Sequence, residues 1–304
     1  MKRIFLVYNP NSSQYRRVKT DILEKTDEFK GYVLGKYAIK KTSFEKNVAE
    51  LSKILENDDL IISAGGDATA AIAANAILKS KKDVTLSVLP YGNFNDLART
   101  LNTKTLSDAL SNTTKTKKLY PLSVYVDGKF WRHATCYVTI GMTGEAVEIF
   151  DDEKIRKTLQ KGHKSSWRSY RDLAMWYFKN RHSKIFLPNL ILNGKKQPKK
   201  TSDYAAVNGR SMCRVMRGGD DFLYPKRFMS LTGTLANLFH LTILMTKSII
   251  KKVPAEKTNG DLLEFTVPTT IEIQAEGEYK VFENVQKIEI KKDSDPIKVI
   301  LKEK

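Results

Sequence analysis

The sequence has little cysteine, no long apolar run and neither of the common phosphate-binding motifs. Two cysteines in 304 residues do not make a disulfide framework, and they fit a reduced, cytoplasmic setting. No stretch reaches the ~18 uninterrupted apolar residues of a membrane span, because basic side chains interrupt even segment 231–253. The first apolar run ends at Asn9-Pro10, too soon for a secretory signal, and reads as a strand. The patterns GxxxxGK[ST] and GxGxxG are absent, which excludes the usual nucleotide loops.

Acidic residues are also scarce relative to basic ones. Lys and Arg number 52 against 34 Asp and Glu, a formal net charge of +18. So large an excess indicates an anionic partner: a lipid headgroup surface, a nucleic acid or a nucleotide. The four histidines have neither histidine nor cysteine partners at ligand spacing, so no zinc site is expected. The length and an apolar content of 41% predict a globular chain of two domains.

Two short segments carry most of the functional signal. Residues 61–69 read IISAGGDAT and residues 88–99 read VLPYGNFNDLAR. Each is an apolar run that breaks into a glycine turn with an aspartate and then continues as a helix-like stretch. Such turns follow parallel strands, whose carboxyl ends share one crevice. Glycine turns and helix N-termini suit phosphate groups, so we expect a nucleotide there.

The first ~125 residues alternate strand-like and helix-like segments, which predicts a parallel sheet covered by helices. The expected strands are Ile4–Tyr8, Leu60–Ser63 and Thr85–Leu89, and the expected helices are Phe44–Glu56, Thr69–Leu78, Asp96–Leu101 and one after Ser107.

From about Leu122 the pattern changes to a mainly antiparallel β domain. It begins with a hairpin of Ser123–Val126 and Lys129–Ile140 around an Asp-Gly turn. Further expected strands are Lys184–Leu192, Tyr204–Val207, Leu263–Val267, Thr270–Gln274 and Lys287–Lys291. Two helical insertions are expected at about 164–180 and 231–250.

The two glycine segments resemble motifs of the diacylglycerol kinase catalytic-domain family. Gly65-Gly66-Asp67-Ala68-Thr69 is similar to its Gly-Gly-Asp-Gly-Thr motif, and residues 89–99 are similar to its Pro-x-Gly-Thr-x-Asn-Asp-x-Ala-Arg segment. The opening strand with its Asn-Pro turn, and a Glu-Gly-Glu at 276–278 in place of Asp-Gly-Glu, follow in the family's order. The resemblance implies an N-terminal three-layer α/β domain, like that of NAD and lipid kinases, and a β-rich lipid-substrate domain. We expect the first to comprise residues 1–122 plus about 283–304, and the second residues 123–282.

The resemblance also implies the residues of the site and its cofactors, ATP and Mg²⁺. The nucleotide-binding set is Asn9, Pro10, Gly65, Gly66, Asp67, Ala68, Thr69, Gly92, Asn93, Asn95 and Asp96. Asp67 would also hold Mg²⁺, through a water. Ala68 stands where the family has glycine, and it would be strained if that position required a positive φ.

By the same resemblance the catalytic residues are Glu276, Glu278 and Asp67, with Glu276 in place of an aspartate base. Its extra methylene moves the carboxylate by ~1.5 Å, a shift that can cost about 10²-fold in rate. The family's acidic segment for a second, structural Mg²⁺ is replaced here by Pro225-Lys226-Arg227, so we expect that metal to be absent. Asp220 and Asp221 are the nearest acids that could compensate.

These observations favour an ATP-dependent lipid kinase that phosphorylates a hydroxyl of diacylglycerol or a related lipid. A basic, aromatic helix at 164–180 predicts peripheral binding to the anionic inner face of a membrane, from the cytoplasmic side. No nucleic acid is expected, and the oligomeric state is not readable. Two alternatives stay open: a weak or inactive nucleotide- or lipid-binding relative, and an NAD kinase-like enzyme.

Overall fold

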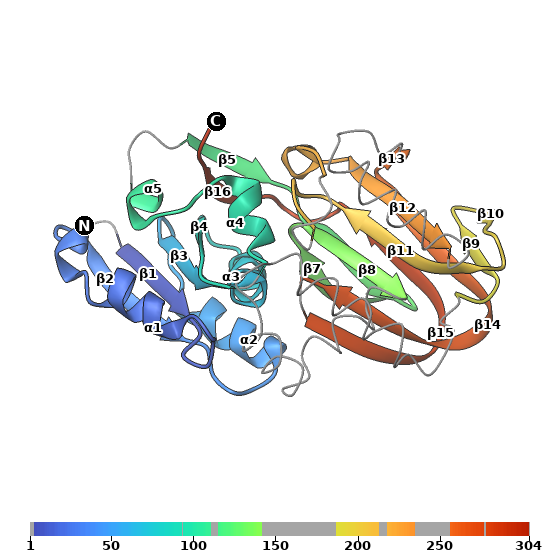
Figure 1. The fold of residues 1–304 in the computed structure, drawn as a ribbon, viewed down its shortest axis with the longest axis horizontal. Helices are drawn as coiled ribbons and strands as arrows, with labels where there is room; N and C mark the ends of the chain where they lie inside the picture. The colour runs from blue at the N-terminus through green and yellow to red at the C-terminus, as the bar shows by residue number, and fades with distance from the viewer. Residues whose placement is uncertain are drawn as a thin grey trace, which may run out of the picture.

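The computed structural model contains two β-sheets and describes residues 3–92, 94–110, 115–141, 187–212, 218–234, 256–276 and 278–303 (Figure 1). The first sheet has the order β2-β1-β3-β4-β16-β5. Its strands are β1 (Arg3–Tyr8), β2 (Val33–Ala38), β3 (Leu60–Gly65), β4 (Thr85–Pro90), β5 (Lys115–Leu119) and β16 (Ile297–Leu301). All neighbours run parallel except β5, which pairs antiparallel with β16.

Helices cover both faces of this sheet, because its strands are apolar on both sides. In β1, Ile4 and Leu6 pack in one core, and Phe5 and Val7 pack in another. The helices are α1 (Tyr15–Val18), α2 (Phe44–Ile54), α3 (Asp67–Ser80), α4 (Asp96–Leu101) and α5 (Leu106–Leu110), with a π turn at Lys19–Leu23 and a 3₁₀ turn at Thr26–Phe29 after α1. α2, α3 and α4 contribute to the core of Phe5, whereas the α1 region and α5 contribute to that of Ile4. The predicted three-layer α/β arrangement is confirmed.

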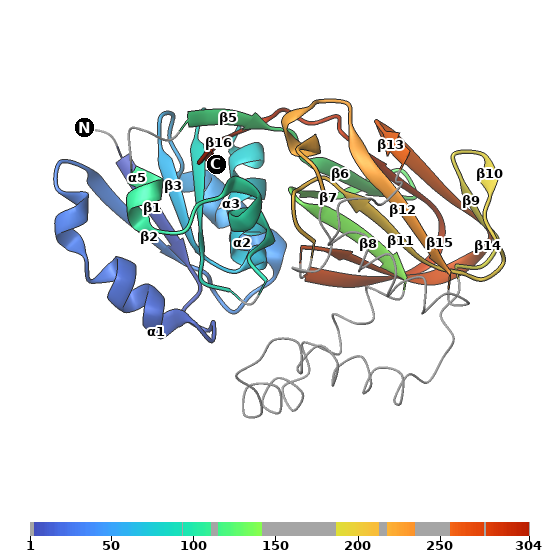
Figure 2. The same cartoon turned by 45° about the horizontal axis from the view of Figure 1, so that its top comes forward.

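The second sheet is antiparallel at every described pairing and curls into a half-barrel beside the first (Figure 2). Its main order is β13-β12-β11-β8-β14-β15-β6-β7, with the β9–β10 hairpin joined to β14. The strands are β6 (Leu122–Val126), β7 (Lys129–Ala134), β8 (Tyr137–Gly141), β9 (Leu190–Leu192), β10 (Lys195–Lys196), β11 (Thr201–Val207), β12 (Phe228–Thr234), β13 (Glu256–Thr258), β14 (Gly260–Ala275) and β15 (Glu278–Lys291), and a 3₁₀ turn lies at Asp221–Leu223.

Several expected elements differ from the structure. The strand expected over Lys129–Ile140 is broken at Thr135-Cys136 into β7 and β8, and Leu263–Val267 and Thr270–Gln274 merge into β14. The helix expected at 231–250 is wrong at its start, because residues 231–234 belong to strand β12. The rest of that segment and the helix expected at 164–180 lie outside the described residues. Strands β2, β5, β10, β12, β13 and β16 were not predicted, and β9 is shorter than expected.

The chain returns to the first sheet after residue 291. β15 stays paired in the second sheet up to Lys291, and β16 then inserts between β4 and β5. The crossing therefore lies later in the sequence than the boundary near residue 283 that we expected. The division into a nucleotide domain and a substrate domain remains a prediction.

Candidate functional site

The carboxyl ends of β1, β3 and β4 bring the sequence-predicted turns to one edge of the first sheet. The strand order 2-1-3-4 makes the β1/β3 boundary a topological switch point, where open α/β sheets bind ligands. Asn9 and Pro10 directly follow β1, and Gly65 ends β3. The Asn9 side chain accepts a hydrogen bond from the Asn11 backbone at 2.9 Å, which fixes its loop as an Asx turn. Pro10 is exposed.

The two glycine turns touch each other through their backbones. A Cβ on Gly92 would lie 2.2 Å from the Cα of Gly66, so only glycine fits at this contact. A Cβ on Gly65 would lie 2.4 Å from the Oγ1 of Thr69, whose side chain folds back over the first turn. The Tyr91 N–H donates to the Gly65 carbonyl at 3.1 Å. The turns thus form one surface on which phosphate oxygens can approach backbone N–H groups.

Asn95 shapes the second turn. Its Oδ1 accepts from the Gly92 N–H at 2.6 Å, and its Nδ2 donates to the Gly92 carbonyl at 2.7 Å. Its φ of 57° is left-handed, a conformation that asparagine tolerates better than most residues. Asn93 lies outside the described residues.

Asp67 joins the two turns. Its Oδ1 accepts from the Asp96 N–H at 2.6 Å and from the Leu97 N–H at 3.3 Å, so the first residue of α3 caps the start of α4. Burial and the neighbouring charge of Asp96 raise the pKa of Asp67 to about 7. Ala68 lies in the first turn of α3 and is not among the residues with positive φ, so the strain considered at this position does not arise.

Asp96 connects this edge to the second sheet. Its carboxylate is fully buried and accepts a hydrogen bond from the Ser211 hydroxyl at 2.5 Å. A second contact joins α3 to β7, where Asn75 donates to the His133 carbonyl at 3.0 Å and accepts from the His133 N–H at 3.1 Å. These bonds hold the second sheet against the nucleotide-side turns.

Glu276 lies at the tip of the β14–β15 hairpin, and its side chain is buried. Its Oε1 accepts from the Thr135 hydroxyl at 2.5 Å and from the Cys136 N–H. Burial raises the pKa of Glu276 to about 7. The two hydrogen bonds oppose this rise because they stabilise the ionised carboxylate, whereas the charge of Asp67 adds to it. The structure therefore places within electrostatic range of each other two acids that are 209 residues apart in the sequence. The glutamate has a φ of 54°, a backbone conformation that aspartate, asparagine and glycine adopt more readily.

Glu278 is half-buried near Arg132, a cation of β7 that sequence analysis missed. Arg132 alternates with half-exposed neighbours on a strand at the end of the sheet order, so its pattern is that of an ordinary surface cation. In the folded chain Phe44 and Glu45 of α2 contact the guanidinium, and Trp131 covers it as well.

The region expected to lack a second metal is filled by cations. The carboxylate of Asp221 is buried, and it pairs with Arg227 Nε at 2.6 Å and Lys257 Nζ at 3.3 Å. Lys292 Nζ donates to the carbonyls of Asp221 at 2.5 Å and Tyr224 at 2.8 Å. Burial lowers the pKa of Lys292 to about 7. The amine of Lys292 donates hydrogen bonds to both carbonyl oxygens whether it is charged or neutral. These residues therefore do not fit a divalent cation.

Among the described residues, no three His, Cys, Asp or Glu side chains are grouped so as to hold a metal ion. In the same part of the chain, none of the helices is both long and apolar enough to cross a bilayer.

Comparisons with known proteins give the same picture. Residues 3–124 match the family model of the diacylglycerol kinase catalytic domain. The chain is 36% identical over 103 residues to a diacylglycerol kinase of Staphylococcus aureus (strain bovine RF122 / ET3-1), and 36% identical over 104 residues to one of Staphylococcus epidermidis (strain ATCC 12228 / FDA PCI 1200). Each alignment covers 33% of this chain and 32% of the relative, so only about a third of their length is matched.

Solved structures show the same fold over nearly the whole chain. A diacylglycerol kinase from Bacillus anthracis str. Sterne superposes with a TM-score of 0.69 at 14% identity, covering 99% of this chain and 97% of that one. A putative diacylglycerol kinase from the same source gives 0.70 at 14% identity. Residues 3–124 thus match the diacylglycerol kinase catalytic domain family, and over this part the chain is a distant homologue of the bacterial diacylglycerol kinases.

Proposed function

We propose that this protein transfers the γ-phosphoryl group of ATP to a hydroxyl of diacylglycerol or a related lipid. The observation that carries the proposal is the buried Glu276 carboxylate, which lies within electrostatic range of Asp67, the residue that follows the glycine pair of the first turn. The match of residues 3–124 to the diacylglycerol kinase catalytic domain supports a lipid kinase. The neutral headgroup of such a lipid offers a hydroxyl and no acid of its own, so the protein has to supply the base.

The nucleotide is assigned to the edge built by Asn9 and the two turns. Gly66 and Gly92 let the phosphates approach the backbone, and the N-termini of α3 and α4 favour negative charge there. Mg²⁺, when bound with ATP, would neutralise charge on the β- and γ-phosphates. Two nearby acids with raised pKa values favour a cation between them, and we assign Asp67 to that ion, through a water.

Glu276 is assigned as the general base. Thr135 and Cys136 hold its Oε1, which orients the carboxylate, and we assign Oε2 to the acceptor hydroxyl. The hydroxyl oxygen forms a bond to the γ-phosphorus as its proton passes to Glu276, and the bond to the ADP oxygen breaks. With a pKa of about 7 the carboxylate is a base of suitable strength near neutral pH, so turnover rises as pH increases through about 7.

The test is transfer of radiolabel from [γ-³²P]ATP to a panel of diacylglycerol, sphingosine, ceramide and NAD. Label is expected in diacylglycerol or a related lipid and not in NAD. Glu276→Gln is expected to lower turnover by about 10²- to 10⁴-fold, because the amide cannot accept the proton. Its affinity for ATP should stay within about twofold of the wild type, since the residue faces the acceptor.

Asp67→Asn is the matched variant on the nucleotide side. The amide oxygen can still accept from the Asp96 backbone, so the turns stay together while the charge is lost. Turnover should fall, and the effect of Mg²⁺ on ATP binding should weaken. Normal turnover in either variant would contradict the roles assigned here.

A second candidate function is a nucleotide- or lipid-binding protein without transfer. It is favoured by Arg227, Lys257 and Lys292, which take the place of the acidic segment expected from the family. ATP binding without label in any acceptor, from a folded preparation, would select this alternative.

A further inference from the structure

Arg132 is a buried cation where the second sheet meets α2. Arg132 is only 5% exposed to solvent. The guanidinium carbon lies 4.0 Å from the ring centre of Phe44 and 4.3 Å from that of Trp131. Two aromatic rings therefore hold the planar group in one orientation.

Two of its three nitrogens lack hydrogen-bond partners. Nη2 donates to Glu45 Oε1 at 3.1 Å. Nε and Nη1 are buried and have no acceptor. Buried donors in native proteins are nearly always paired, and unpaired N–H groups on a cation are especially costly. Such a group is poised for oxygen atoms that a ligand brings.

The place of Arg132 relates it to the candidate site. Burial lowers its pKa, while the charges of Glu278, Glu45 and Glu276 raise it, so the guanidinium is within electrostatic range of both candidate catalytic glutamates. If its only purpose were to neutralise these acids, the unpaired nitrogens would be expected to donate to them.

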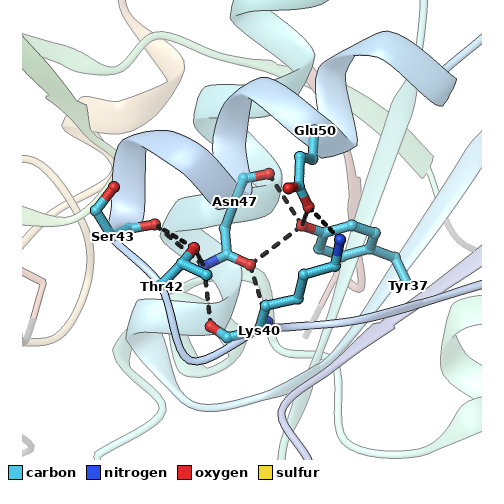
Figure 3. Close-up of polar contacts among 6 residues, drawn as sticks. All are labelled: Tyr37, Lys40, Thr42, Ser43, Asn47 and Glu50. Carbon is cyan, nitrogen blue, oxygen red and sulfur yellow. Dashed lines mark hydrogen bonds and ion pairs between the residues drawn. The ribbon is translucent and has the colours of Figure 1, made fainter.

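A network of polar contacts, centred on Asn47, holds the start of α2 (Figure 3). Asn47 accepts from the Lys40 N–H at 2.9 Å and donates to the carbonyls of Lys40 and Ser43 at 3.1 Å. The Tyr37 hydroxyl donates to Asn47 Oδ1 at 3.1 Å, and Ser43 caps the helix. This network fixes the loop that presents Phe44 and Glu45, and hence the orientation of Arg132.

We propose that Arg132 binds a phosphate group of a substrate, with Nε and Nη1 donating to its oxygens. The inference rests on the proposed function, and it names chemistry that Asp67 and Glu276 do not supply. Charge-assisted bonds from arginine to phosphate are strong and directional. Two sources bring such a group: the nucleotide, or an acceptor lipid whose headgroup is itself a phosphodiester.

The test measures binding by titration calorimetry without turnover. The probes are ADP, soluble dihexanoyl phosphatidylglycerol, and dihexanoylglycerol, which has no phosphate. Arg132→Gln is expected to lose at least 10-fold in affinity for ADP if the nucleotide is the source, or for dihexanoyl phosphatidylglycerol if the lipid is. Binding of dihexanoylglycerol should not change. Lys129→Gln, which removes an exposed charge from the same strand, is the matched control and should leave every affinity unchanged.

If Arg132→Gln does not fold, Arg132→Lys decides the question. Lysine keeps the charge among the three glutamates but lacks the planar set of donors, so at least a fivefold loss for one phosphate probe is expected at an unchanged melting temperature. Equal affinities for every probe in a folded variant would overturn the inference and leave Arg132 as a neutraliser of acids. Because no transfer is measured, a chain that binds phosphate through Arg132 but phosphorylates nothing would refute the proposed function alone.

Discussion

The two sheets differ in how far their sequences are constrained. Similarity to the family model ends at residue 124, whereas the fold similarity covers 99% of the chain. In the first sheet, the contact between Gly66 and Gly92 leaves no room for a Cβ on Gly92. In the second, alternation of apolar and polar residues suffices to build an antiparallel sheet. Its sequence can therefore drift while its shape persists, and the unusual chemistry of this chain lies there, in Glu276, Arg132 and Lys292.

The largest effect should come from a methyl group at the turn contact. Gly92→Ala would place its Cβ against the backbone of Gly66, where no flexible side chain can yield. We expect a loss of about 3 kcal/mol or more in the free energy of unfolding, and loss of measurable ATP binding.

The control for this variant lies in the second sheet. A Cβ on Gly260 would lie 3.4 Å from the Cβ of Lys291 and 3.8 Å from the Ile290 carbonyl oxygen, both ordinary van der Waals contacts. Gly260→Ala should therefore leave stability and ATP binding close to wild type. Chemical denaturation of both variants measures the difference, and equal losses would break the contrast between the sheets.

A pH-dependent effect should come from Glu276. Its pKa of about 7 in the folded protein exceeds its ordinary value of 4.5, so the folded state holds this proton more tightly than the unfolded chain. The stabilising contribution is complete below about pH 4.5 and is lost as pH rises through about 7. Glutamine does not titrate. Between pH 5 and pH 8, the stability of Glu276→Gln relative to wild type should rise by about 2 kcal/mol.

Denaturant unfolding of both proteins across this pH range measures that change. A difference that stays constant with pH would show that the carboxylate is not held in the buried setting described above.

A smaller effect is expected at the joint between the sheets. Asn75→Ala removes two hydrogen bonds to the backbone of His133 and should cost about 1 to 2 kcal/mol. Ser80→Ala on the same helix removes two local bonds, one to the Ile77 carbonyl and one from the Lys82 N–H, and should cost less because neither joins the two sheets. If Asn75→Ala also lowers turnover at unchanged ATP affinity, the joint positions the acceptor side.

The smallest effect should come from an exposed ion pair. Asp83 and Lys298 join β16 to the start of β4, but both side chains are about half exposed. Asp83→Asn should change stability by less than about 1 kcal/mol, with an effect that shrinks further in high salt. Thermal unfolding at two salt concentrations checks this, and a larger loss would mean that sequence constraint in the first sheet extends beyond the glycine turns.

Local signals predicted strands β1, β3 and β4 of the first sheet and the turns that follow β3 and β4. The runs before Gly65 and Gly92 are mostly apolar, and both turns use residues with a clear backbone reason to be there. β2 was not predicted because Val33–Ala38 is a largely exposed edge strand. It also contains a glycine, Gly35, which makes room for the ring of Phe5. β14 looked like two strands because of Pro268, and the pairing register shifts there instead of ending.

The site was predictable only in part. The residues of the glycine turns follow a local sequence pattern, whereas the residues of the second sheet acquire their setting only through long-range packing. The glycines and aspartates of the two turns can be recognised in the sequence from their residue type and their spacing. Arg132 and Lys292 become meaningful only when distant segments pack around them, and no local pattern distinguishes them from the many other cations of this basic chain. The short bonds from Thr135 and Cys136 to Glu276 likewise depend on a break between β7 and β8 that looked like one strand.

The late return of β16 has a consequence for biosynthesis. The slot between β4 and β5 is filled by residues 297–301, which leave the ribosome long after residue 119. Until then the nascent sheet keeps two open edges, and the half-barrel has time to form first. Premature termination before residue 297 would leave those edges unpaired. The fragment should then be bound by chaperones or degraded by proteases, even if its glycine turns were correctly formed.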